Sequence, residues 1–164
     1  MMVIGIDPGT RHLGWGIVRR DGTRHVHVAH GVIHTDTSAK IADRLCQIER
    51  ALTEVVETHR PTAAAVETIF FAKDATAAAK LGHARGVALL VLARAGIPVA
   101  EYPPARVKKA VVGHGRADKR QIAMVVRTLL GLRSAPPSDA ADALAIALTH
   151  LAAAPLLALT AGKS

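Results

Sequence analysis

Cysteine is almost absent from this sequence, and long apolar segments are few. The single cysteine, Cys46, cannot form an intramolecular disulfide, which is typical of a protein that works in a reducing cytosol. Residues 1–5 lack the basic start of a secretory signal peptide. The apolar stretch 144–159 contains His150 and Pro155, so it predicts a core helix rather than a membrane span. We therefore expect a cytoplasmic protein with no membrane partner.

Aromatic residues are also scarce, and two of them are adjacent. They are Trp15, Phe70, Phe71 and Tyr102. Phe70 and Phe71 follow soon after Glu67, in a segment that predicts a loop entering a helix capped by Asp74. An exposed ring in such a loop could stack on bases or wedge between them. Packing in the hydrophobic core is the alternative.

Acidic residues are outnumbered by basic residues, 13 to 21, and the formal net charge is +8. The excess is concentrated in the segment 105–133, which holds eight Lys or Arg residues and one acid, Asp118. Positive charge gathered in one segment of an otherwise nearly neutral chain predicts a surface that binds a polyanion. A solvated helix face is the alternative.

The order of the predicted elements indicates an α/β domain. With 164 residues, half of them hydrophobic, the chain is long enough for one domain with a sizeable core, which we place at 1–154, followed by a short tail at 155–164. Periodicity and turn signals predict five strands and five helices. The strands are 3–6, 13–19, 27–35, 63–67 and 97–102; the helices begin near 38, 74, 104, 118 and 138 and end near 55, 95, 112, 132 and 153. Three closely spaced strands followed by alternating helices and strands predict a mixed five-stranded sheet, first antiparallel and then parallel, flanked by helices.

Four carboxylates stand at the ends of apolar segments. Asp7 follows the run 2–6, Glu67 follows 63–66, and Asp139 and Asp142 open a very apolar helix. Burying a carboxylate is costly unless it is paired, and no Lys or Arg lies within two residues of any of the four. One divalent metal site would explain all four. Oxygen ligands suit Mg²⁺ or Mn²⁺ rather than zinc.

Taken singly, these acids have ordinary explanations. Asp139 and Asp142 are three residues apart and share a helix face, where acids in a first turn commonly interact with the helix dipole. Asp7 could cap a turn with Pro8 and Gly9. Only the set of four favours a metal site.

Small residues recur every four positions in the helix predicted at 74–95. Ala78, Gly82 and Gly86 give one face of this helix almost no side chain. Because glycine inside a helix costs about 1 kcal/mol, we expect a close packing contact there. The neighbour is either the sheet or a second subunit.

Five segments of the sequence stand out: IGIDPGT at 4–10, KLGHARGVA at 80–88, RVK at 106–108, VVG at 111–113 and DAADALAIA at 139–147. In this order they closely resemble the RuvC Holliday-junction resolvases. The resemblance runs from about residue 2 to about residue 150, and as a set its motifs are highly specific.

The resemblance implies an RNase H-like fold and a homodimer that cuts four-way DNA junctions symmetrically, in recombination and DNA repair. It implies two Mg²⁺ ions per active site, for which Mn²⁺ can substitute, and a branch-migration complex of the RuvA and RuvB type as a partner. It places the catalytic and metal-binding acids at Asp7, Glu67, Asp139 and Asp142. It places a base-wedging aromatic at Phe70 and important lysines at Lys108 and Lys119. For the face with Gly82 and Gly86, it favours a dimer interface over packing on the sheet. The residues that we expect to bind DNA are Phe70, Phe71, Lys108, Lys109, Arg116, Lys119 and Arg120.

Three other functions remain open from the residues alone. A similar Asp-x-Gly-Thr opens actin-like kinases and ATPases, but those chains are usually much longer and have a second phosphate loop. A nucleic-acid-binding module without activity is disfavoured by the complete set of acids. A nuclease that acts on RNA or on another branched DNA is also possible, because no residue pattern in the sequence indicates whether a 2′-hydroxyl is recognised.

Overall fold

A five-stranded mixed sheet forms the centre of the computed structural model, which describes residues 1–68 and 75–161, with side chains to residue 154. The sheet order is β3-β2-β1-β4-β5. The strands are β1 (Met2–Asp7), β2 (His12–Asp21), β3 (Arg24–His34), β4 (Ala63–Glu67) and β5 (Val99–Tyr102). β1, β2 and β3 pair antiparallel, and β4 joins β1 and β5 in parallel pairs. The predicted mixed sheet is confirmed.

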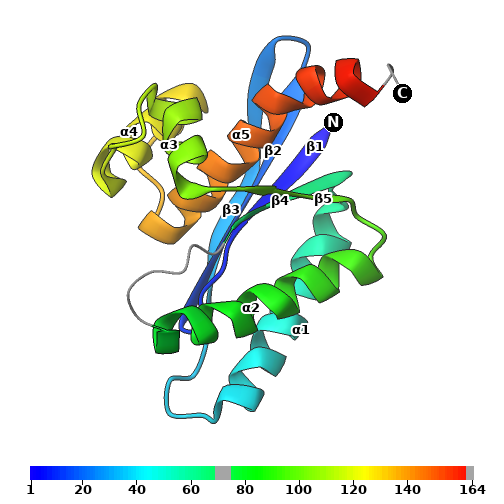
Figure 1. The fold of residues 1–164 in the computed structure, drawn as a ribbon, viewed down its shortest axis with the longest axis vertical. Helices are drawn as coiled ribbons and strands as arrows, with labels where there is room; N and C mark the ends of the chain where they lie inside the picture. Colours follow the sequence, from blue (N-terminus) through cyan, green and yellow to red (C-terminus); the bar gives the residue numbers. More distant parts are fainter. Residues whose placement is uncertain (69–74, 162–164) are drawn as a thin grey trace.

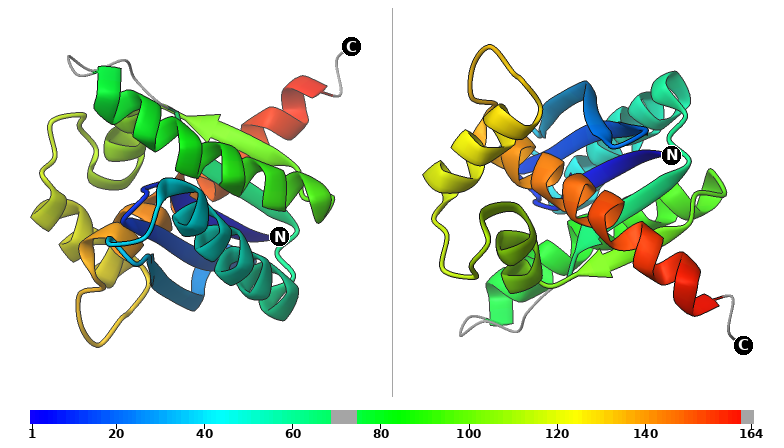
Figure 2. Two further views of the ribbon diagram at one scale, coloured as in Figure 1. Left: turned by 90° about the horizontal axis from the view of Figure 1, so that it is seen from below. Right: turned by 90° about the horizontal axis from the view of Figure 1, so that it is seen from above.

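Helices cover both faces of the sheet (Figures 1 and 2). α1 (Ile41–His59) and α2 (Ala75–Arg94) lie on one face, and α3 (Pro104–Val112), α4 (Lys119–Leu129) and α5 (Ser138–Ala161) lie on the other. Each face has its own buried core, because side chains alternate between the two faces along every strand. In β4, Ala65 packs towards α5 while Ala64 and Val66 pack towards α1 and α2.

Glycines let α5 lie directly on the strands. A Cβ atom at Gly5 would lie 2.0 Å from the carbonyl oxygen of Ala143, and one at Gly14 would lie 2.0 Å from that of Asp139. Any side chain at these positions would collide with helix backbone. The first turns of α5 are therefore held against the adjoining ends of β1 and β2.

Three helix ends test the predicted boundaries. Asp118 and Gln121 form the predicted capping box at the start of α4. α1 begins later than predicted, with Lys40 at the N-cap and no side-chain cap, because Ser38 instead hydrogen-bonds to the carboxylate of Asp36. α5 continues to Ala161, past the predicted end near 153, since strong helix formers follow Pro155. No described helix is long and apolar enough to cross a membrane.

Candidate active site

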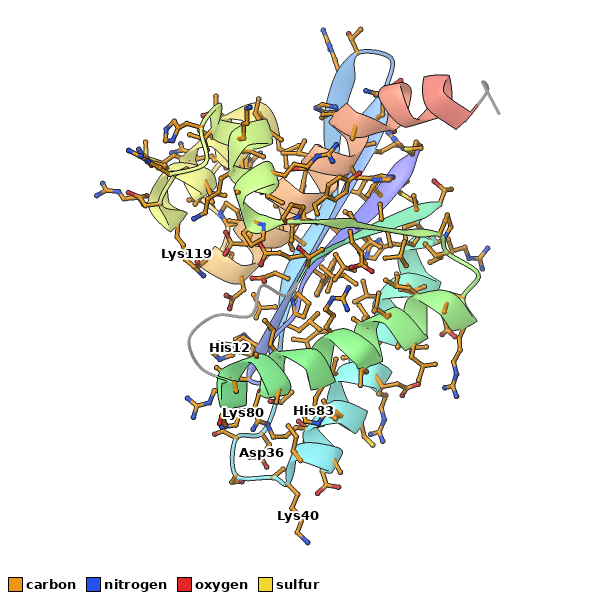
Figure 3. All side chains as sticks on the ribbon, in the orientation of Figure 1. His12, Asp36, Lys40, Lys80, His83 and Lys119 are labelled. Atoms are coloured by element: carbon orange, nitrogen blue, oxygen red, sulfur yellow. The ribbon has the colours of Figure 1, made fainter. Side chains whose placement is uncertain are left out.

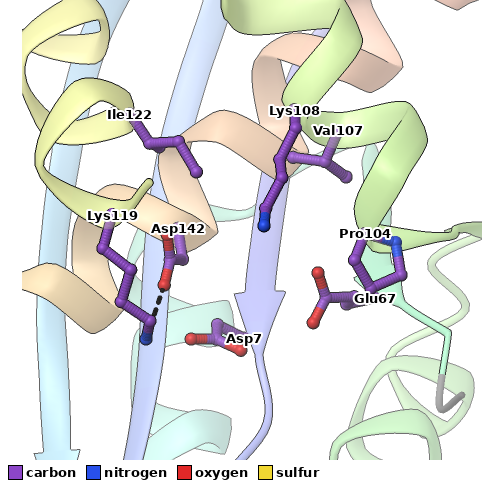
Figure 4. A pocket seen from close by; sticks show the side chains of 8 residues that line it. All are labelled: Asp7, Glu67, Pro104, Val107, Lys108, Lys119, Ile122 and Asp142. Atoms are coloured by element: carbon purple, nitrogen blue, oxygen red, sulfur yellow. Dashed lines mark ion pairs between the residues drawn. The ribbon is translucent and has the colours of Figure 1, made fainter. Parts of the chain in front are cut away.

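A pocket of about 220 Å³ opens where β1 and β4 end, beneath α3, α4 and α5 (Figure 4). Its lining combines three of the four predicted acids with two lysines. The lining residues are Asp7, Glu67, Pro104, Val107, Lys108, Lys119, Ile122 and Asp142. Five elements distant in sequence thus contribute to one site.

The sheet fixes the direction of two of the acids. Asp7 ends β1 and Glu67 ends the adjacent parallel strand β4, so both lie at the carboxyl edge of the sheet, where α/β folds commonly bind ligands. Asp7 pairs with Gly14 of β2, and the backbone of Asp139 lies directly over that glycine. The contact between α5 and Gly14 therefore brings the start of α5 beside Asp7.

The acids destabilise one another's ionised forms. Burial, followed by the charges of Asp142, Glu67 and Asp139, raises the pKa of Asp7 to about 8. Burial and then Asp142 raise the pKa of Glu67. Burial also raises the pKa of Asp142, although Lys119 opposes the shift. The cluster is short of positive charge, as a cation-binding site would be.

Two lysines supply part of that charge from opposite sides of the pocket. The Nζ atom of Lys119 lies 3.2 Å from Oδ2 of Asp142 (Figure 4). Burial alone would lower the pKa of Lys119, but the carboxylates of Asp142, Asp7 and Asp139 outweigh it and raise that pKa. The charge of Lys108 opposes the rise that burial causes in the pKa of both Glu67 and Asp142.

The donor set fits a hard divalent cation. All the candidate ligands are carboxylates, the ligands that Mg²⁺ and Mn²⁺ prefer. Burial and the charges of the neighbouring acids raise the pKa of Asp7, and a bound cation would oppose that rise. Within residues 1–68 and 75–161, no three His, Cys, Asp or Glu side chains are close enough together to form a ready-made site for one ion. The carboxylates share a pocket without converging on a single point.

The remaining predicted residues lie around this pocket or outside the described chain. Asp139 is not in the lining but is close enough to raise the pKa of Asp7. Lys109, Arg116 and Arg120 are exposed on and between α3 and α4. Phe70 and Phe71 lie outside the described residues, as does Asp74.

The small residues of α2 do not all pack on the sheet. Gly86 is exposed, and a Cβ atom added there would meet nothing within 4 Å. Gly82 is half-buried. Gly86 therefore leaves a smooth, open position on the outer face of α2, and the sheet is not its neighbour.

Sequence reasoning missed two polar residues close to the acids. His12, labelled in Figure 3, begins β2, and its Nδ1 atom lies 3.7 Å from Oδ2 of Asp139. Arg85 of α2 reaches the backbone of Glu67. A hairpin between residues 7 and 12 could have suggested His12, but no local pattern indicates the contact of Arg85.

Comparison with known proteins gives a consistent family. The family model described as "Crossover junction endodeoxyribonuclease RuvC" matches residues 3–150. A protein of that name from Sorangium cellulosum is 61% identical over 163 residues, covering 99% of this chain and 91% of its own. Another, from Rubrobacter xylanophilus, is 51% identical over 150 residues, covering 91% of this chain and 84% of its own.

Solved structures agree with these sequence relatives. Thermus thermophilus RuvC in complex with a Holliday junction substrate has a TM-score of 0.89 and 43% identity, covering 95% of this chain and 96% of that one. The fowlpox virus resolvase in complex with Holliday junction DNA shares the fold at 13% identity, with a TM-score of 0.58 and coverage of 92% and 99%. The predicted RNase H-like fold is confirmed, and the chain belongs to the RuvC family of crossover junction endodeoxyribonucleases.

Proposed function

We propose that this protein resolves four-way (Holliday) DNA junctions by metal-dependent hydrolysis of phosphodiester bonds, in recombination and DNA repair. One observation carries this function: three acids from β1, β4 and α5 line a single pocket between two lysines. The relatives named for crossover junction cleavage, and the Thermus protein bound to a Holliday junction, support the choice of substrate.

Asp7, Glu67, Asp139 and Asp142 are the proposed metal ligands and catalytic residues. Asp7 is the proposed central ligand, because burial and then the charges of all three other acids raise the pKa of its carboxyl. Bound Mg²⁺, for which Mn²⁺ can substitute, would supply Lewis-acid chemistry at the scissile phosphate, and we propose two ions per site. Glu67 and Asp142 flank Asp7 in the pocket (Figure 4). Asp139, at the edge of the pocket, would ligate a metal ion or help to orient the attacking water.

The basic residues would hold DNA around these acids. Lys108 and Lys119 line the pocket and would contact the phosphates nearest the cut. Lys109, Arg116 and Arg120 are exposed and would contact phosphates farther away. Each such contact releases counterions, so binding should weaken steeply as salt rises.

Phe70 and Phe71 are proposed to contact bases at the junction. If one ring wedges between bases, Phe70→Ala or Phe71→Ala will impair junction cleavage far more than junction binding, with little change in melting temperature. Cleavage by a wedge-deficient variant should be largely restored on a junction whose central bases are already unpaired, because the substrate then needs no opening. Global unfolding of the variant would instead support a core position.

Symmetric cutting calls for two active sites, and we propose a homodimer formed through α2. The support is the open position at Gly86 together with Leu90, an exposed leucine one turn along the same helix. A branch-migration complex of the RuvA and RuvB type is the proposed larger partner.

The deciding experiment compares a synthetic four-way junction with a linear duplex of the same sequence, with and without Mg²⁺ or Mn²⁺. Paired symmetric nicks on the junction alone, dependent on metal, are expected. Asp7→Asn should still bind the junction but cut more than about 1000-fold more slowly, because a central ligand is lost. Cutting by Asp7→Asn at the wild-type rate would overturn the site assignment, and binding without any cutting by the wild type would favour a binding module.

A further inference from the structure

Arg85 approaches the active site from the face of the sheet opposite to the pocket. It projects from α2, and its Nε atom donates a hydrogen bond to the backbone carbonyl oxygen of Glu67 at 3.4 Å. Its Nη2 atom makes an ion pair and hydrogen bond with Oε2 of Glu101 on β5. One guanidinium thus joins a helix to the ends of two neighbouring strands.

The strand register explains why these contacts leave the Glu67 carboxylate free. Glu101 pairs with Val66, whose side chain packs in the core beneath α1 and α2. Glu67 pairs with Tyr102, which is buried in the core on the α5 face. Because side chains alternate between the two faces of the sheet, Glu67 points into the pocket, while Arg85 contacts the main chain of Glu67 from the opposite face, which α2 covers.

This arrangement suits arginine and not lysine. The planar guanidinium presents several N–H donors in a fixed fork and can serve two acceptors at once, whereas an ammonium acts as a single flexible charge. The Arg85 side chain is 19% exposed and that of Glu101 is 46% exposed, so the pair is partly shielded from water. Both contacts are made within the protein, in an orientation set by α2.

We propose that Arg85 is a positioning residue for Glu67. By tying α2 and Glu101 to the carbonyl of Glu67, it holds the end of β4 and therefore the carboxylate that serves the metal. This role rests on the proposed function of Glu67. Arg85 is not among the described residues that line the pocket, so it would act through Glu67.

The test uses Arg85→Met, which keeps a long side chain but removes every donor. A matched control is Arg94→Met in the same helix, because Arg94 also pairs with a glutamate, Glu49, at 3.9 Å, but lies away from the pocket. For each protein we would measure junction cleavage against Mg²⁺ concentration, Mn²⁺ binding by calorimetry without DNA, junction binding without metal, and melting temperature.

Loss of a residue that orients a metal ligand typically weakens metal binding by 10-fold or more. We expect Arg85→Met to raise the half-saturating Mg²⁺ concentration about tenfold and to weaken Mn²⁺ binding by a similar factor. Excess Mg²⁺ should restore much of the rate, and junction affinity should stay within about twofold of the wild type. Arg94→Met should match the wild type in metal dependence. Arg85→Lys should recover the melting temperature more fully than the metal affinity.

Two results would overturn the proposal. They are unchanged metal dependence in Arg85→Met, with or without a lower melting temperature, and a loss of junction binding with normal Mn²⁺ affinity. If Arg85→Met does not fold, Glu101→Gln keeps the arginine and should still raise the Mg²⁺ requirement by a smaller factor; no rise would also count against the role. Glu67→Gln separates the proposed active site from the proposed role of Arg85. If Glu67→Gln cut junctions at the wild-type rate, the site itself would be refuted, whatever the result for Arg85→Met.

Discussion

The ammonium group of Lys119 lies 3.2 Å from the carboxylate of Asp142, although the two residues belong to different helices, α4 and α5. The Lys119 side chain is 70% exposed and that of Asp142 is 19% exposed, so the lysine reaches from the surface into the pocket. Lys119 is therefore placed to balance charge among the acids, and its proposed contact with a DNA phosphate would be made at the same point.

Replacing Lys119 with methionine should slow cleavage by about 10- to 100-fold, because the charge that favours ionised Asp142 and Asp7 is lost. The pKa of both acids should rise, so the pH at which metal-dependent cleavage reaches half its maximum should move upward. Single-turnover rates between pH 6 and pH 9 would measure both effects. An unchanged pH profile would show that Lys119 does not act on the acids.

The metal-free protein should lose stability as pH rises towards 8. The pKa of Asp7 is about 8 in the folded protein against an ordinary 3.8, so between these values the folded state holds a proton that the unfolded state has released. The stability conferred by this proton is full below about pH 4 and is lost as pH rises through about 8. Thermal unfolding in EDTA would follow this loss, and Asp7→Asn should flatten the curve. A wild-type melting temperature that rises from pH 5 to pH 8 would contradict the raised pKa.

Neighbouring lysines offer a matched pair for separating catalysis from DNA binding. Lys108 lines the pocket, whereas Lys109 is exposed and outside it. Lys108→Ala should reduce the cleavage rate at saturating junction, while Lys109→Ala should mainly weaken binding and reduce the salt slope by about one. Binding isotherms at several salt concentrations, with single-turnover rates, would distinguish them. If Lys108→Ala and Lys109→Ala changed the cleavage rate and the DNA affinity to the same extent, the proposed difference between the two lysines would be wrong.

A large side chain at Gly86 should disrupt the proposed homodimer without unfolding its subunits. The position is open in the monomer, and replacing a helical glycine should stabilise the helix by up to about 1 kcal/mol. Gly86→Arg should therefore be monomeric with a normal or raised melting temperature and should lose symmetric paired nicking. Sedimentation analysis and nick mapping would measure this, with Gly86→Ala as a smaller replacement that retains the dimer. A dimeric Gly86→Arg would place the interface elsewhere.

Local patterns predicted the sheet, because strand periodicity is visible in sequence. They also singled out acids at the ends of apolar segments, three of which the structure brings into one pocket. The capping box at Asp118 was found for the same reason. The start of α1 was wrong, since several residues before it could cap a helix and only the fold decides that Ser38 bonds to Asp36. The contact between Arg85 and Glu67 could not be predicted, because it depends on how α2 lies across β4 and β5. The roles assigned to the acids remain predictions.

The glycines beneath α5 have a consequence for how this site can change. Gly5 and Gly14 bring helix backbone onto strand backbone, so the separation between Asp7 and the start of α5 is set by main-chain contact. Side chains elsewhere in the two cores can be exchanged without lengthening that contact. Core mutations that change thermal stability can thus accumulate while the spacing between Asp7 and the start of α5 stays constant. A side chain at Gly5 or Gly14, in contrast, would change that spacing.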